Sequence, residues 1–278
     1  MNTRIVSDSA CNLYEYPGVD FVSVPMKVNA GDKVYIDDSR LDVLNMMTEL
    51  SSFKGKSNTG HPSIREWIKS FGDADNVFGV TVTSKLSGSY NSAVFAAEEY
   101  MEENPGRQAF ILDSLSTGPE MELIIEKYNE MIQAGLSFAQ ICSGIQQYLK
   151  TTHIWWSLTS LKNFVANGRI NPAVAGVIKL LGICIVGTTN VGELQPVHRC
   201  NGSSKAMKQI LNSMLDDGFR GGKVRIRHSF NPEAAEELAS LIRATYPNCD
   251  IKIGLNTGLC GYYVEKGGVV AAFEGSES

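Results

Sequence analysis

Hydrophobic positions in the first half of the chain alternate between two spacings. Short apolar runs have the length of buried strands and fall at 4–7, 77–81 and 109–112. Between them, apolar residues three and four positions apart predict helices over 41–50, 64–71, 89–102 and 119–133. Ser63 and Glu66 form a capping-box pattern at the start of the second helix. We expect this alternation to build a mostly parallel sheet with helices on both faces.

Two further patterns complete the predicted fold. The segments 21–28 and 33–36 flank Asn-Ala-Gly-Asp and predict a hairpin, with Ser39 as the cap of the helix that follows. After a helix at 138–149, strands outnumber helices. The strands are predicted at 153–158, 183–186, 194–199, 223–227, 251–255 and 269–273, and the helices at 172–181, 203–215 and 232–244. The expected fold is therefore α/β with two domains, an α/β domain over 1–152 and an α+β domain over 153–278.

Composition narrows the class of protein. The 278 residues are 43% hydrophobic and 20% charged, which is enough to bury a sizeable core. The formal net charge of -5 argues against general nucleic-acid binding. The sequence shows no secretory signal, and its most apolar stretch, 173–187, is interrupted by Lys179 and is too short to span a bilayer. Six cysteines without a Cys-x-x-Cys pair are typical of a reduced compartment, so we expect a cytoplasmic protein without a membrane segment.

Charge is uneven along the chain. Residues 199–227 hold seven bases against two acids, either as a solvated face or as a docking surface for an acidic partner. Within this run Lys223, Arg225 and Arg227 alternate along a predicted strand and therefore share one face.

Small polar residues follow three predicted strands of the first domain, at 7–9, 83–89 and 113–114. Because parallel strands end at one edge of a sheet, these residues predict a ligand crevice there, although each is also an ordinary turn former. The second segment leads into a helix, whose free amides attract a carboxylate or a phosphate. Ser87 adds a hydroxyl, and Gly88 allows close approach of the backbone.

Other chemistries have weak support. The sequence contains neither Gly-x4-Gly-Lys-Ser/Thr nor Gly-x-Gly-x-x-Gly, so no nucleotide or dinucleotide loop is predicted. The four histidines lack metal-ligand spacing with cysteine or aspartate, and we expect no metal. Ser87, His228 and Asp113 offer the residue types of a hydrolase triad, but Gly-x-Ser-x-Gly is absent.

Five motifs, taken together, resemble the DegV family along nearly the whole chain. They are Ser7-Asp8-Ser9 with Asn12-Leu13, Thr59-Gly60-His61-Pro62-Ser63, the segment Ser84 to Tyr90, Asp113-Ser114, and Asn167-Gly168-Arg169-Ile170. The resemblance implies two α/β-type domains with a fatty acid in a pocket at their junction. It also implies a non-catalytic carrier without a cofactor, similar to the fatty-acid-binding subunits of bacterial fatty acid kinases. Such subunits present the acyl carboxylate to an ATP-using partner, which makes an acyl phosphate.

The resemblance also implies roles for individual residues. Thr59 and Ser87, with the amide of Gly88, are expected to hold the carboxylate. Further candidates for the head group or the domain junction are His61, Ser84, Arg169 and Asn256. The resemblance places Arg199 on the partner-facing side, and the charge pattern adds Arg225 and Arg227 to it. Because a pocket for an acyl chain must be apolar, candidates for its wall are Trp155, Trp156, Phe164, Val174 and Ile178, each of which is also an ordinary core residue.

This sequence departs from the family pattern at three places that bear on phosphotransfer. They are Gly60, the segment around Cys184, and Asn256, where the family has histidine. Two alternatives therefore stay open: a binding module for a different small carboxylate or lipid with no kinase role and, with less support, a hydrolase.

Overall fold

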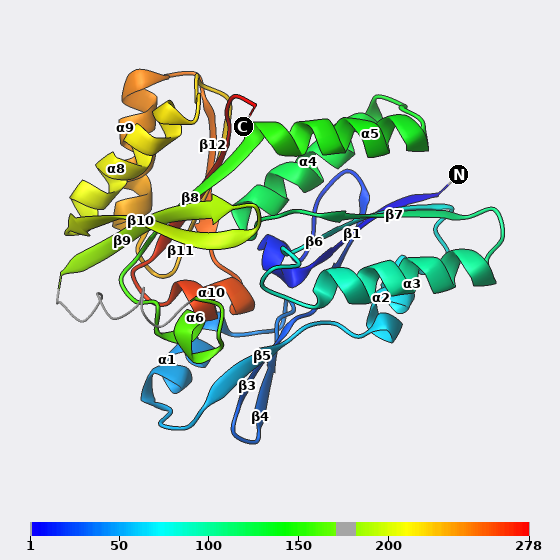
Figure 1. The fold of residues 1–278 in the computed structure, drawn as a ribbon, viewed down its shortest axis with the longest axis horizontal. Coiled ribbons are helices and arrows are strands. Elements are labelled where there is room, and N and C mark those ends of the chain that lie inside the picture. The colour runs from blue at the N-terminus through cyan, green and yellow to red at the C-terminus, as the bar shows by residue number, and fades with distance from the viewer. Residues whose placement is uncertain (1, 171–181, 278) are drawn as a thin grey trace.

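The structure is a computed structural model that describes residues 2–170 and 182–277. Three sheets organise the chain, and one helix, α4 (Pro119–Gln133), packs against both of the larger ones (Figure 1). The first large sheet is parallel and the second is mixed, which confirms the expected two-part α/β architecture.

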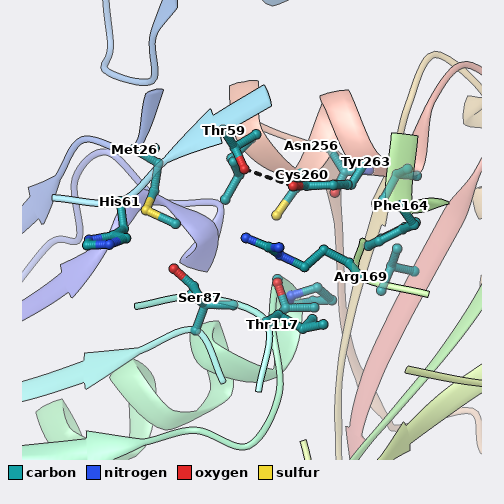
Figure 2. A pocket seen from close by; sticks show the side chains of 18 residues that line it. Met26, Thr59, His61, Ser87, Thr117, Phe164, Arg169, Asn256, Cys260 and Tyr263 are labelled. Atoms are coloured by element: carbon teal, nitrogen blue, oxygen red, sulfur yellow. Dashed lines mark hydrogen bonds between the residues drawn. The ribbon is translucent and has the colours of Figure 1, made fainter. Parts of the chain in front are cut away.

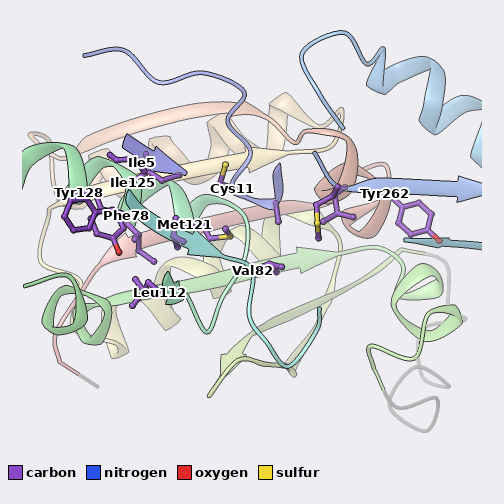
Figure 3. Close-up of a cluster of buried hydrophobic side chains, with 14 of the residues drawn as sticks. Ile5, Cys11, Phe78, Val82, Leu112, Met121, Ile125, Tyr128 and Tyr262 are labelled. Carbon is purple, nitrogen blue, oxygen red and sulfur yellow. The ribbon is translucent and has the colours of Figure 1, made fainter. Parts of the chain in front are cut away.

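Sheet A belongs to the first half of the chain, and all its neighbouring strands are parallel. Across the sheet the strands are β2 (Asp20–Val24), β1 (Thr3–Asp8), β6 (Asn76–Thr81) and β7 (Gln108–Asp113). The helices α2 (Ile64–Phe71) and α3 (Ser89–Glu103) cover one face, and α4 and α5 (Phe138–Tyr148) cover the other (Figure 1). Figure 3 shows the second of these interfaces, where Ile5 and Phe78 pack against Met121, Ile125 and Tyr128 of α4.

Sheet B is a small antiparallel sheet below sheet A in Figure 1. Its strands are β4 (Lys33–Ile36), β3 (Lys27–Ala30) and β5 (Ser57–Gly60). The β3–β4 hairpin was expected, but the prediction of one strand over 21–28 is wrong. Pro25 separates β2 from β3, and the two strands belong to different sheets. Proline lacks the amide hydrogen that would continue the first ladder.

Sheet C contains the strands of the second half. In order they are β10 (Glu193–Asn201), β9 (Ile183–Asn190), β8 (Thr152–Leu158), β13 (Val269–Glu274), β11 (Lys223–His228) and β12 (Asp250–Leu255). The helices α8 (Ser203–Asp216) and α9 (Pro232–Thr245) pack on one face. The domain boundary expected between 152 and 153 falls at the start of β8 and stays a prediction.

Several short elements were not predicted. They are the 3-10 turns at Ser9–Cys11 and Leu149–Thr151, β5, α6 (Lys162–Ala166) and α10 (Gly258–Val264). The helix expected at 41–50 is α1 (Val43–Ser52), because the cap is Asp42, which accepts the Asn45 amide at 2.9 Å, and not Ser39. The capping box of Ser63 and Glu66 is present as predicted. The helix predicted over 172–181 lies outside the described residues.

Candidate functional site

A cavity lies where sheet B, the amino ends of α3 and α4, α6 and α10 meet (Figure 2). Most of its wall is apolar, formed by Met26, Val82, Leu86, Pro119, Phe164, Leu259, Val264 and Val270. Its polar side chains are Thr59, His61, Ser87, Thr117, Arg169, Asn256, Cys260 and Tyr263. The cavity has a volume of about 80 Å³, roughly that of three water molecules. The structure therefore brings five predicted site residues, Thr59, His61, Ser87, Arg169 and Asn256, to one cavity.

Thr59 reaches the cavity from β5 and is already held by a partner. Its Oγ1 lies 2.8 Å from the hydroxyl of Tyr263 on α10. The Tyr263 ring stacks on Phe164, with ring centroids 4.7 Å apart. Burial raises the pKa of the Tyr263 hydroxyl, so the phenol keeps its proton near neutral pH.

Ser87 and Gly88 form the turn that leads into α3. The Ser87 Oγ accepts the Ser89 amide at 3.2 Å, and Gly88 is the residue before the first turn of the helix. Among residues 2–170 and 182–277, no acceptor pairs with the Gly88 amide. The His61 imidazole covers this turn, because a Cβ on Gly88 would meet its Nε2 at 2.6 Å. His61 is itself exposed, which places it at the mouth of the cavity.

Arg169 supplies a positive charge to the same space. Its side chain extends into the cavity between Ser87, Thr117 and Cys260 (Figure 2). Its Nη1 donates a hydrogen bond of 2.8 Å to the Asn167 carbonyl, which orients the guanidinium and leaves its charge unneutralised. Within the described part of the chain, no carboxylate pairs with Arg169. A carboxylate that enters the cavity therefore meets a cation that has no anionic partner among residues 2–170 and 182–277.

Asp8 supports the loop that carries Ser87. Its Oδ2 accepts the Val82 amide at 3.1 Å and the Ser89 hydroxyl at 2.7 Å, which joins the end of β1 to the segment between β6 and α3. The Oδ1 is buried and has no hydrogen-bond partner among the described residues. Burial raises the pKa of Asp8 to about 6. The polar segment at the end of β1 was one of three predicted to line the ligand crevice. It supports the loop beneath the cavity and does not line the cavity.

The amino end of α10 is fixed by buried polar groups. Asp37 accepts the amides of Gly258 and Leu259 at 2.7 and 2.9 Å. Asn12 accepts the Thr257 amide at 2.8 Å and donates to the side chain of Asn256 at 3.2 Å. Asn256 therefore lines the cavity while tying the end of β12 to the first domain.

The basic face of β11, which was predicted as a docking surface, is largely covered by the protein itself. Lys223, Arg225 and Arg227 do share one face of β11, but α4 covers that face. Arg225 is fully buried and pairs with Glu126 at 2.6 Å, and Arg227 pairs with Glu122 at 2.7 Å. The expectation that Arg225 and Arg227 face a partner is therefore wrong, because the glutamates of α4 occupy both guanidinium groups.

Arg199 differs from these two arginines. It is exposed on β10, an edge strand of sheet C, and no acid pairs with it among the described residues. Of the three arginines predicted to face a partner, Arg199 is therefore the one exposed for contact with another molecule.

The remaining candidates lie elsewhere. Ser84 is exposed, and its amide donates to Asp113. Trp155 packs towards α8, and Trp156 lies in the core beside α6 without reaching the cavity. Of the predicted apolar wall, Phe164 is confirmed, and Val174 and Ile178 lie outside the described residues.

The hydrolase triad is not assembled. The Nδ1 of His228 accepts the Asn231 amide, Asp113 accepts the amides of Ser84 and Leu115, and Ser87 accepts the Ser89 amide. No hydrogen bond links the three residues within the described ranges. Nor do those ranges contain a group of three or more histidines, cysteines and acids placed for a metal ion.

Tyr263 and Thr117 are cavity residues that the sequence did not predict. Both line the cavity, and neither stands in a spacing that indicates a site. Tyr263 belongs to the unpredicted helix α10, and Thr117 to the loop before α4. A run of glycines before two tyrosines marks a turn, but only the packing of α10 on β5 places the second tyrosine next to Thr59.

The fold and cavity define a two-domain α/β protein with a mostly apolar cavity that also holds hydroxyls and a cation. A family model described as uncharacterised proteins of the DegV family matches residues 2–274, and the chain belongs to that family. A DegV domain-containing protein of Streptococcus pyogenes serotype M1 is 36% identical, over 99% of this chain and 100% of the relative.

Two known structures are similar along their whole length. A DegV family protein from Eubacterium eligens, loaded with heptadecanoic acid, has a TM-score of 0.97 at 37% identity, with 99% of this chain and 100% of that chain covered. The Streptococcus pneumoniae Fatty Acid Kinase (Fak) B3 protein, loaded with linoleic acid, has a TM-score of 0.97 at 34% identity with the same coverage. In this protein, no helix within the described ranges has the length and apolar character needed to cross a bilayer.

Proposed function

We propose that this protein binds a long-chain fatty acid as a carrier, with the carboxylate at the polar end of the cavity. The observation that carries the proposal is the Arg169 guanidinium, which no carboxylate pairs among the described residues, in a cavity whose wall is mostly apolar. Thr59 and Ser87 supply hydroxyls, and Gly88 supplies an amide at the positive end of α3. A buried carboxylate needs such partners to stay ionised.

The apolar wall contributes binding free energy because it buries the acyl chain of the ligand. Each buried methylene contributes about 0.8 kcal/mol, so a long acyl chain gains roughly 10 kcal/mol before the costs of ordering it. The volume of about 80 Å³ is too small to hold such a chain. We therefore expect side chains around Phe164 and Val270 to move outward when the tail enters.

Similar proteins support the ligand class. Both the Eubacterium eligens protein and the pneumococcal Fak B3 protein carry a fatty acid, and each is similar to this chain over its whole length. An aliphatic acid matches both parts of the cavity, since it combines one anion with a long apolar tail.

Mass spectrometry of an organic extract of the purified protein tests the proposal. A stoichiometric long-chain fatty acid is expected. A different organic acid would favour the alternative of another carboxylate ligand, and an empty protein that hydrolyses short esters would favour a hydrolase.

Arg169→Gln tests the head-group assignment. Because hydrogen bonds to a charged group contribute about 1.5–3 kcal/mol, we expect the variant to bind fatty acid roughly ten- to a hundredfold more weakly. Lys85→Gln removes a nearby exposed cation and is the matched control. Equal affinities of all three proteins, measured by calorimetry at pH 8, would contradict the assignment.

A second proposal concerns a partner. We infer that the loaded protein presents its carboxylate to an ATP-dependent fatty acid kinase, with exposed Arg199 at the contact. The similarity to the Fak B3 protein favours this role over storage alone. With a kinase subunit and ATP, acyl phosphate should form, and Arg199→Ala should slow its formation without lowering fatty-acid affinity. Equal rates for both proteins would remove Arg199 from the contact.

A further inference from the structure

The two tyrosines of α10 connect the elements that surround the polar end of the cavity. Tyr263 bonds to Thr59, and the preceding Tyr262 bonds to Ser57 on the same strand at 2.7 Å. The Tyr262 hydroxyl also accepts the Asn167 side-chain amide at 2.9 Å. Helix α10 therefore holds β5 at two points and the Arg169 segment at a third.

The Thr59–Tyr263 pair differs from the Ser57–Tyr262 pair in where it lies. Thr59 and Tyr263 both line the cavity, whereas Ser57 and Tyr262 face a separate groove beside α1. A tyrosine hydroxyl is a better proton donor than an aliphatic hydroxyl, because it is far more acidic. The favoured arrangement has Tyr263 donating to the Thr59 Oγ1, which leaves the hydrogen of Thr59 free. Within the described ranges Thr59 has no other side-chain hydrogen bond, so this hydrogen has no acceptor before a ligand arrives.

We propose that Tyr263 is a positioning residue, which turns the Thr59 hydroxyl into an oriented donor for the bound carboxylate. This inference rests on the proposed fatty-acid site and adds a residue to it. A hydroxyl that already accepts one hydrogen bond donates the next one more strongly, since the two bonds polarise each other. Stacking on Phe164 holds the tyrosine ring, so the donor direction is set before the ligand enters.

Tyr263→Phe tests the inference because it removes the hydroxyl and keeps the ring. We expect its affinity for palmitic acid to fall three- to tenfold and its affinity for methyl palmitate to change less than twofold. The pKa of bound, carboxyl-¹³C-labelled palmitic acid, followed by NMR, should rise, since a weakened donor stabilises the ionised form less. A purely structural role of Tyr263 would lower both affinities together and leave this pKa unchanged.

Two further variants isolate the route through Thr59. Ser57→Ala removes the neighbouring bond between β5 and α10, and it should leave the carboxyl pKa and the acid-to-ester preference as in the unchanged protein. In a Thr59→Val background, Tyr263→Phe should have no further effect on either quantity. A full effect of Tyr263→Phe in that background, or none in the unchanged protein, would overturn the inference.

Palmitic acid binding by the unsubstituted protein distinguishes a failure of this inference from a failure of the proposed function. If that protein fails to bind palmitic acid at all, the proposed function fails. If it binds palmitic acid and Tyr263→Phe behaves identically, only the role of Tyr263 fails.

Discussion

At the scale of single residues, the hydroxyl of Ser87 has two tasks. It accepts the Ser89 amide at the start of α3, and it lies at the polar end of the cavity beside Arg169 (Figure 2). The turn between strand and helix in the sequence predicted the second task. The first task depends on the turn geometry and has consequences for how a substitution is interpreted.

Ser87→Ala should therefore weaken ligand binding and, to a smaller extent, the fold. Loss of a donor to a buried carboxylate costs about 1–3 kcal/mol, a factor of roughly ten to a hundred in affinity. Loss of the hydrogen bond from the Ser89 amide costs about 1 kcal/mol of stability in the ligand-free protein. Thermal melts with and without added fatty acid separate the two effects, because ligand stabilisation scales with affinity. Ser84→Ala, on an exposed residue outside the cavity, is the control, and an unaltered affinity in Ser87→Ala would place the head group elsewhere.

At the scale of elements, α4 connects the two large sheets. Its apolar residues pack on sheet A, while Glu122 and Glu126 reach Arg227 and Arg225 on β11. The strand pattern correctly indicated that the basic residues share a face. It contained no information on what covers that face, because the covering helix is about a hundred residues away in the sequence.

Breaking the buried pair should destabilise the protein markedly. Arg225→Met leaves Glu126 buried with fewer partners, and removal of one member of a buried pair costs roughly 3–5 kcal/mol. Lys252, which lies 2.9 Å from Glu126, favours the lower end of that range. Arg199→Met removes an exposed arginine and should change stability by less than about 0.5 kcal/mol. Urea unfolding of both variants is the measurement, and similar midpoints would show that the buried pair contributes little.

The turn between β9 and β10 is a second contact between distant elements. Gly192 has a φ of +84°, and a Cβ there would collide with the side chain of Thr83, which precedes the Ser87 turn. The hairpin tip therefore rests on the loop that forms one side of the cavity.

Gly192→Ala should separate the hairpin from this loop. Gly202→Ala is the matched control, since Gly202 has a φ of +88° but open space around it. Both variants carry backbone strain of about 1–3 kcal/mol, and only Gly192→Ala adds a collision. We expect it to be the less stable of the two in urea and to bind fatty acid more weakly. Equal losses in both variants would mean that the contact with Thr83 has no energetic role.

At the scale of the whole molecule, burial of Asp8 makes stability depend on pH. Its pKa rises from 3.8 to about 6 in the folded protein, so the folded state holds this proton more tightly than the unfolded state. Stability from this group is therefore highest below about pH 4 and falls as the pH rises towards 6. The shift corresponds to about 3 kcal/mol.

Asp8→Asn should flatten this part of the stability curve. The amide oxygen can accept from Val82 and Ser89 as the carboxylate does, and no charge is buried at neutral pH. Urea midpoints measured from pH 4 to pH 7 should fall less steeply in the variant, which should be the more stable protein at pH 7. A parallel course of the two curves would assign the pH dependence to other groups.

The sequence by itself determined most of the local structure. The spacing of apolar residues predicted α4 with its observed bounds, and the pattern of Ser63 and Glu66 predicted the start of α2. Such features depend on residues within one or two turns of each other, so the order along the chain is sufficient. The same holds for the turn at Ser87 and Gly88, where a strand passes into a helix.

Only the tertiary structure decided which of these features meet. Thr59, Ser87, Arg169 and Tyr263 belong to four different segments, and their convergence depends on how sheet B, α3, α6 and α10 pack together. The packing of α4 on sheet C buried Arg225, while Arg199 stayed exposed on an edge strand of that sheet. A linear pattern reports which face of an element is polar or apolar. The neighbour that covers that face is selected by contacts between distant parts of the chain, and these decide whether a charge is paired, exposed or free to bind a ligand.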